Sequence, residues 1–160
     1  MANLLYSYRF ATSIDIDFIM KGILEILFLE ENKTSFFSEE KNQEQLNLIG
    51  NAISENTIII AENNSEVMGF IWFNVTHKCF YGLDYGNLEN QYMFISYIWV
   101  IEAYRNKGIA SKLYDKVIDI AKEKNITKIW VDIYMSNDKS INFHNNLGFQ
   151  PQITLYSKDI

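Results

Sequence analysis

The sequence predicts an α/β fold, with a mixed, mostly antiparallel central sheet and helices on both of its faces. Segments 56–62 and 66–78 are rich in β-branched and aromatic residues and flank the turn-forming trio NNS, as a β-hairpin requires. Segment 91–100 is apolar at both alternating positions, which is typical of a central strand covered on both sides. A helical repeat and a further strand follow it, so the middle of the sheet is expected to be locally parallel.

Composition limits the classes of function. The chain has 160 residues, 48% of them hydrophobic and 21% charged, and no repeat or linker divides it, so we expect a single domain over 1–160. The net charge of −6 disfavours nucleic acid and anionic membranes as main partners. Cys79 stands alone, so neither disulfides nor a metal site are expected. Because the sequence shows no secretion signal and no apolar run of about 18 residues, we expect a cytoplasmic protein.

The first half of the chain is expected to begin with a strand over 6–11 and two helices. Thr12 and Asp15 form a capping-box pattern, and the helix that follows has apolar residues on one face and ends near Glu30. A second, shorter helix is expected to begin after Ser38, with acidic residues in its first turn. The predicted hairpin follows this helix.

The second half contains an aromatic loop at 79–90, the central strand, and a helix from Ile109 to Asn125. A strand over 128–136 comes next, and then a short helix within 137–149 that Gly148 stops. Segment 152–158 is expected to form a last strand.

The stretch AYRNKGIASKLY, residues 103–114, is a strand-to-helix turn that suits an anion. A helix N-terminus presents unpaired N–H groups and the positive end of the helix dipole. Gly108 and Ala110 leave room for close approach to the backbone, and Arg105 and Lys107 add positive charge. The alternative is that Gly108 serves packing alone and that the basic residues are solvated. The turn matches neither the phosphate-binding P-loop nor the three-glycine dinucleotide pattern.

Two motifs carry a resemblance to a known family. Residues 105–110, RNKGIA, resemble the coenzyme A signature Q/R-x-x-G-x-G/A of the GCN5-related N-acetyltransferase (GNAT) superfamily. The segment NDKSINFHNNLGF, 137–149, is similar to the later motif of that family. The resemblance implies the GNAT fold, acetyl-CoA as cosubstrate, and direct attack of an amine on the thioester. Members of the family often form homodimers, which is a further partner that the resemblance implies.

The resemblance also implies roles for individual residues. The backbone of three residues where the central strand leaves its neighbour would bind the pantetheine arm: Ile98, Trp99 and Val100. The backbone amides of the turn would hold the pyrophosphate: Arg105, Asn106, Lys107, Gly108, Ile109, Ala110 and Ser111. Three residues would line the other wall of the arm's path: Asn137, Ser140 and Phe143.

The chain departs from the family pattern at three places. Glu102 replaces a common proline, and the region of Ser96 and Tyr97 offers no carboxylate as a general base, which leaves a base acting through water. At the position where the family usually has a tyrosine that protonates the leaving thiolate, this sequence has His144. We expect His144 to be the general acid, because an imidazole can donate a proton as a phenol does. The alternative is a histidine packed or solvated without chemistry.

The acceptor is expected to be a primary amine of a small molecule. Five acidic residues of the first two helices could hold such a cation, with a solvated acidic face as the alternative: Glu25, Glu30, Glu31, Glu39 and Glu40. Aromatic residues of the 79–90 loop could cover the acceptor or serve packing: Phe80, Tyr81 and Tyr85. Two other hypotheses remain open, a protein or peptide N-acetyltransferase and a CoA-binding regulatory module without catalytic activity.

Overall fold

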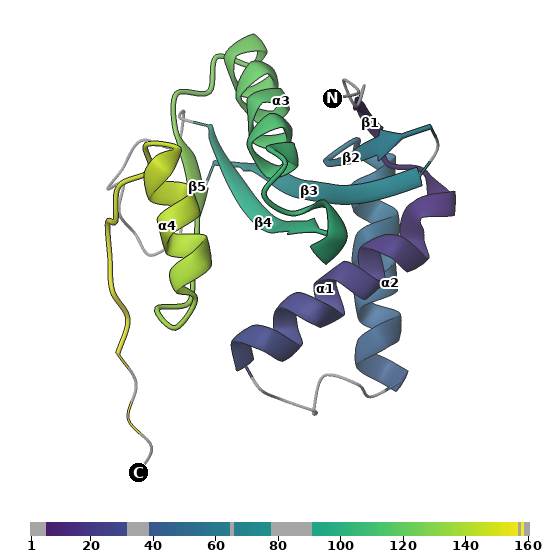
Figure 1. The fold of residues 1–160 in the computed structure, drawn as a ribbon, viewed down its shortest axis with the longest axis horizontal. Helices are drawn as coiled ribbons and strands as arrows, with labels where there is room; N and C mark the ends of the chain where they lie inside the picture. Colours follow the sequence, from purple (N-terminus) through teal and green to yellow (C-terminus); the bar gives the residue numbers. More distant parts are fainter. Residues whose placement is uncertain (1–5, 32–38, 65, 78–90, 157, 159–160) are drawn as a thin grey trace.

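The computed structural model describes residues 6–31, 39–64, 66–77, 91–156 and 158, and within them a five-stranded sheet has the order β1-β2-β3-β4-β5 (Figure 1). Strands β1 (Ser7–Phe10), β2 (Ile58–Asn63), β3 (Glu66–Thr76) and β4 (Tyr92–Val100) pair antiparallel, and β5 (Ile129–Val131) pairs parallel with β4. The mixed, mostly antiparallel sheet of the sequence prediction is therefore confirmed.

Helices cover both faces of the sheet (Figure 1). Helices α1 (Ile16–Glu31) and α2 (Glu39–Ser54) bury one apolar cluster against it, centred on Ile23, Phe70 and Trp99. Helices α3 (Ile109–Glu123) and α4 (Asp138–Asn146) bury a second cluster on the opposite face, around Leu113 and Tyr114. Helix α2 has 16 residues, as α1 has, so the expectation of a shorter second helix was wrong. No helix in the described part of the chain is long and apolar enough to cross a membrane.

The predicted capping box is present at the start of the first helix. The Asp15 carboxylate accepts the backbone N–H of Thr12 at 2.8 Å, just before α1. Asp15 is also only 2% exposed, and both of its oxygens accept from the Arg9 guanidinium of β1, at 2.7 and 2.9 Å. The guanidinium extends this network to Glu62 of β2 at 2.9 Å. The helix start is thus tied to the edge of the sheet by a buried charge.

The C-terminal part of the fold differs from the sequence prediction. The expected strand over 152–158 does not form in the described residues, and β5 has three residues where 128–136 was expected. Figure 1 shows the chain after α4 extending away from the body, and Leu155 and Tyr156 are 66% and 94% exposed. The composition of 152–158 favours a strand, but a strand also needs a partner for its backbone groups, so the prediction was wrong. The aromatic loop at 79–90 and the side chain of Cys79 lie outside the described residues.

Candidate active site

Strand β4 separates from β5, which is the last strand at one edge of the described sheet. The two strands pair only from Met93 to Ile95. The β3–β4 register shifts at the same place, since Trp72 opposes Tyr97 whereas Phe73 opposes Ile95, which leaves Ser96 as an extra residue of β4. Such a β-bulge bends its strand and interrupts pairing. From Tyr97 to Val100, β4 is paired with β3 on one side, and from Ser96 to Val100 its other edge is not paired with β5.

The pairing pattern shows which backbone groups of β4 face this open edge. The N–H of Ile101 donates to the carbonyl of Met68 at 2.9 Å, and alternate residues of an antiparallel strand point the same way. The backbone groups of Trp99 therefore face β3; a Cβ at Gly69 would lie 2.6 Å from the Trp99 carbonyl oxygen. Those of Ile98 and Val100 face the open edge. Three residues were expected to bind the pantetheine arm, and two of them, Ile98 and Val100, direct their backbone groups to the open edge of β4.

The glycine turn leads from this edge into α3. After the short 3-10 helix η4 (Glu102–Tyr104), Asn106 and Gly108 have left-handed φ values of 61° and 78°. A Cβ at Gly108 would meet nothing within 4 Å, so the backbone there faces open space. The N–H of Lys112 donates to the Gly108 carbonyl at 3.0 Å as the first bond of α3. The N–H groups of the three preceding residues, Ile109, Ala110 and Ser111, have no acceptor within the helix, which makes the turn a cradle for an anion.

The two basic side chains of the turn are directed by neighbouring groups. The Arg105 Nε donates to the Val100 carbonyl at 2.9 Å, which ties the turn to the end of β4. The Lys107 ammonium lies 5.0 Å from the centre of the Tyr104 ring, a cation–π distance. Arg105 therefore shapes the turn as well as contributing charge to it.

The residues expected on the other wall lie at the start of α4, beside β5 (Figure 1). The Asn137 side chain is the N-cap of this helix, and its Oδ1 accepts the backbone N–H of Ser140 at 3.1 Å. Phe143 packs into the core, with its ring 6.0 Å from that of Tyr114. Asn137 and Ser140 thus lie half-buried at the start of the helix, while Phe143 contributes to packing.

His144 lies in the core between α3 and α4. It is 2% exposed, and the edges and faces of three aromatic rings surround it, those of Tyr114, Phe143 and Phe149. Its Nδ1 lies 2.7 Å from the Ser140 carbonyl oxygen, and its Nε2 lies 2.7 Å from the Tyr114 hydroxyl. Because a carbonyl can only accept, Nδ1 carries the proton and Nε2 accepts from Tyr114.

Burial sets the protonation of this pair. Desolvation lowers the pKa of His144, and the bond to the Ser140 backbone offsets this only in part. Burial likewise raises the pKa of Tyr114, so both groups are neutral at neutral pH. The only proton on the imidazole is held by the Ser140 carbonyl. In this arrangement His144 has no proton directed at a solvent-accessible group, and its expected role as general acid stays a prediction.

The opposite face of β4 carries a carboxylate that is supplied by a helix. The Trp99 Nε1 donates to the Glu25 Oε2 of α1 at 3.0 Å, across 74 residues of sequence. Near the bulge, the Asn74 Nδ2 donates to the Ser96 Oγ at 2.6 Å. Strand β4 itself has no carboxylate near Ser96 and Tyr97, as expected from the sequence. A neighbouring helix, α1, instead places the Glu25 carboxylate against this strand. The sequence predicts a cation-binding role for Glu25 only as one of five acidic residues, and no local pattern indicates its hydrogen bond to Trp99.

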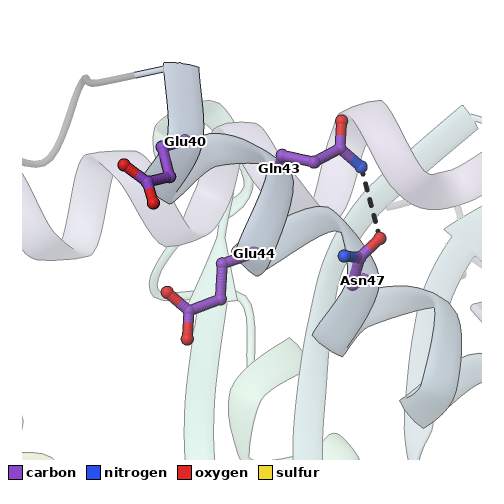
Figure 2. A pocket seen from close by; sticks show the side chains of 4 residues that line it. All are labelled: Glu40, Gln43, Glu44 and Asn47. Atoms are coloured by element: carbon purple, nitrogen blue, oxygen red, sulfur yellow. Dashed lines mark hydrogen bonds between the residues drawn. The ribbon is translucent and has the colours of Figure 1, made fainter.

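Of the other acidic candidates, only Glu40 has a described side chain, and it lies on an exposed face of α2. Glu40 lines a hollow on the surface of α2 together with Gln43, Glu44 and Asn47 (Figure 2). All four belong to one exposed helix face, where the Gln43 Nε2 donates to the Asn47 Oδ1 at 3.2 Å. This is the solvated acidic face of the alternative interpretation. The side chains of three further candidates lie outside the described residues: Glu30, Glu31 and Glu39.

Comparisons with known proteins agree with this geometry. The model of the acetyltransferase (GNAT) family matches residues 23–149. Over 63 residues, 39% of this chain, the sequence is 29% identical to N-alpha-acetyltransferase 30 of Schizosaccharomyces pombe, and the match spans 42% of that relative's length.

Solved structures share the fold over nearly the whole chain. A predicted acetyltransferase from Clostridium acetobutylicum, solved with acetyl-CoA, has a TM-score of 0.76 at 20% identity, covering 97% of this chain and 96% of that one. The aminoglycoside N-acetyltransferase AAC(6')-Iy, solved with CoA, has a TM-score of 0.73 at 17% identity, covering 98% and 96%. A structure described as a transcriptional regulator from Bacillus halodurans has a TM-score of 0.74 at 18% identity, covering 98% and 100%.

Proposed function

The chain belongs to the acetyltransferase (GNAT) family, and from this premise we propose that it transfers the acetyl group of acetyl-CoA to a primary amine of a small molecule. One observation carries the proposal. The open edge of β4, from Ser96 to Val100, leads directly into the left-handed turn at Gly108 and the unpaired amides of α3. A backbone edge followed by an anion cradle suits an elongated ligand that has an amide-bearing arm and a pyrophosphate.

Acetyl-CoA fits these parts in order. The pyrophosphate binds the amides that follow Gly108, where no Cβ stands in its way and the helix dipole favours negative charge. The amides of the pantetheine arm bond to the backbone of Ile98, and the Val100 N–H is a further donor beside the carbonyl that Arg105 occupies. Asn137 and Ser140, at the start of α4, border the arm on the side of β5.

The reaction is a direct transfer. The neutral amine nitrogen attacks the thioester carbonyl carbon, a C–N bond forms and the C–S bond breaks; the nitrogen gives up a proton, and the departing thiolate takes up a proton to become the free thiol of CoA. The ammonium must first lose a proton to become a nucleophile, and an N–H directed at the carbonyl oxygen stabilises the charge that develops there. Positioning the two substrates supplies much of the rate acceleration. Protonation by His144 would require its imidazole to leave the bonds it makes in the core.

Two alternatives have observations in their favour. The match to an N-alpha-acetyltransferase supports a peptide amine as acceptor. The burial of His144, together with the fold shared with a structure described as a transcriptional regulator, supports a CoA-binding module without catalytic activity. Release of free thiol from acetyl-CoA when amines are added separates both enzymatic hypotheses from the module, and the acceptor that supports release separates small molecule from peptide.

The cosubstrate site is tested by Gly108→Glu. We expect CoA affinity measured by calorimetry to fall at least about 100-fold, because the added carboxylate repels the pyrophosphate and blocks approach to the backbone. Gly148→Glu is the matched control: Gly148 also has a left-handed φ, 89°, and open space at its Cβ, but it lies after α4. The control should bind CoA like the unmodified protein. Near-normal affinity of the Gly108 variant would contradict the proposal.

A further inference from the structure

The Glu25 carboxylate is held next to the open part of β4 by one hydrogen bond, which the Trp99 indole N–H donates. We propose that Glu25 is the binding site for the positively charged amine of a small-molecule acceptor, an inference that rests on the proposed acetyl transfer and names the chemistry of its second substrate.

A glycine brings α1 down onto β4. A Cβ at Gly22 would lie 2.6 Å from the Phe70 Cε1 and 2.8 Å from ring atoms of Trp99, closer than real side chains pack. The absence of that Cβ allows the helix to cross directly over the Trp99 ring. Phe18, one turn earlier, contacts the same ring edge-on at 5.3 Å. Glu25, almost one turn after Gly22, therefore reaches the indole nitrogen from a fixed position rather than from a mobile surface.

The ring that holds Glu25 belongs to the open segment of β4. Trp99 is 6% exposed, and its side chain packs on the α1–α2 face of the sheet. Its neighbours Ile98 and Val100 turn their backbone groups to the open edge, where the acyl-carrying arm is proposed to bind. The carboxylate thus stands beside the path of the cosubstrate, on the face that α1 and α2 cover. Since Glu25 is only partly buried, the part of its side chain that stays exposed is where the ammonium of the second substrate would bind.

The charge of Glu25 has no cation to balance it in the described part of the chain. Trp99 supplies a neutral N–H to one oxygen, and neither salt bridge nor further hydrogen bond joins the carboxylate to another described residue. Asp15, just before α1, differs from Glu25 because both of its oxygens already accept hydrogen bonds from Arg9 and Thr12. Glu25 is partly buried, so an ammonium that binds it is held by charge-assisted hydrogen bonds in a region of reduced solvent screening.

The test uses Glu25→Gln, which keeps an oxygen for the Trp99 indole and removes only the charge. Spermidine and neamine are titrated by calorimetry into the CoA-loaded protein. We expect the Kd of whichever probe binds to rise about 10- to 100-fold in Glu25→Gln, the loss typical of a hydrogen bond to a charged group, with unchanged affinity for CoA. Glu44→Gln, on the exposed face of α2, removes the same charge from the molecule and should change the Kd less than about twofold.

The outcomes separate this inference from the proposed function. It is overturned if neither probe binds the unmodified protein, or if Glu25→Gln and Glu44→Gln bind equally well. If a probe binds through Glu25 but no acetyl group is transferred from acetyl-CoA, the amine site stands and the proposed enzymatic function fails. If acetyl transfer to a probe proceeds with an unchanged KM in Glu25→Gln, the function stands and the role of Glu25 fails.

Discussion

The two faces of the sheet hold polar groups in opposite hydrogen-bonding states, a buried histidine on one face and a partly buried glutamate on the other. On the α3–α4 face, His144 has both ring nitrogens bonded, one to a backbone carbonyl and one to the Tyr114 hydroxyl. On the α1–α2 face, the Glu25 carboxylate accepts one bond from Trp99 and has no cation among the described residues. The histidine stood at a motif position that implies catalysis, whereas the glutamate stood in no motif at all.

The hydrogen bonds that a polar group already makes inside the protein bear on its role as much as its residue type does. A polar group whose bonds are all made inside the protein contributes to the stability of one packing arrangement. A charged group that is positioned but left unbalanced favours a ligand of opposite charge. Asp15 supports this distinction, because it also lies by α1 and yet is fully bonded by Arg9 and Thr12.

The largest expected effect concerns the close approach that fixes Glu25. Gly22→Leu should lower the free energy of unfolding by about 3 kcal/mol, because the new side chain must displace the buried Phe70 and Trp99 rings. Gly50→Leu, in α2 on the same face, is the matched control, since a Cβ there meets nothing within 4 Å. It should raise stability by about 0.5 to 1 kcal/mol through helix propensity. Denaturant unfolding of both variants measures the contrast, and equal stabilities would show that α1 does not lie tightly on Trp99.

A smaller effect on stability is expected at Asp15, the carboxylate near α1 whose two oxygens already accept hydrogen bonds from Arg9 and Thr12. Asp15→Asn should destabilise the fold by about 2 kcal/mol at pH 7, since the Arg9 guanidinium loses its buried partner while remaining partly exposed itself. Glu62→Gln, at the more exposed end of the network, should cost less than about 1 kcal/mol. If the two variants are equally stable, the burial of Asp15 has no energetic consequence.

The dependence on pH gives the Asp15 prediction a second readout. Burial alone would raise the pKa of Asp15, but the bonds from Arg9 and Thr12 and the charge of Arg9 outweigh it, so the net pKa is lowered. The unfolded carboxyl binds protons below about pH 3.9, so the stabilisation is complete above that value and is lost as pH falls through the lower folded pKa. The stability gap between the unmodified protein and Asp15→Asn should therefore close in that acidic range. If the stability difference between the two proteins stays constant over this pH range, the pKa of Asp15 is not lowered in the folded protein.

Local signals allowed much of the fold to be predicted. The hairpin, the capping box at Asp15 and the glycine turn at 103–114 are each defined by residues close in sequence, and the structure contains all three. The Glu25–Trp99 and Tyr114–His144 bonds join residues 74 and 30 positions apart, and no periodicity reports such contacts. The predicted strand at 152–158 failed for a related reason. Composition describes what a segment prefers, whereas pairing depends on a neighbour that the sequence does not name.

A further effect on stability, no larger than that of Asp15→Asn, concerns the role of His144. In His144→Phe, the new ring fits among the three aromatic rings, but the Tyr114 hydroxyl loses its acceptor in the core, which should cost about 1 to 2 kcal/mol. Burial lowers the folded pKa of His144, so the stability due to its neutral form is complete above the unfolded value of about 6.5 and is lost as pH falls through the folded pKa. The gap between the two proteins should therefore narrow on acidification from neutral pH.

The same variant separates structure from catalysis. If His144 is structural, we expect His144→Phe to keep its kcat per folded molecule. This kcat is measured well below the unfolding temperature and under conditions where chemistry limits the rate. A general acid predicts a fall of about 10²- to 10⁴-fold with little change in KM for acetyl-CoA, and recovery in His144→Tyr with the alkaline limb of the rate profile moved to higher pH. The bonds to Ser140 and Tyr114 favour the first result. The second would mean that the imidazole leaves the core during turnover, and the difference between the two faces of the sheet would then describe only the resting enzyme.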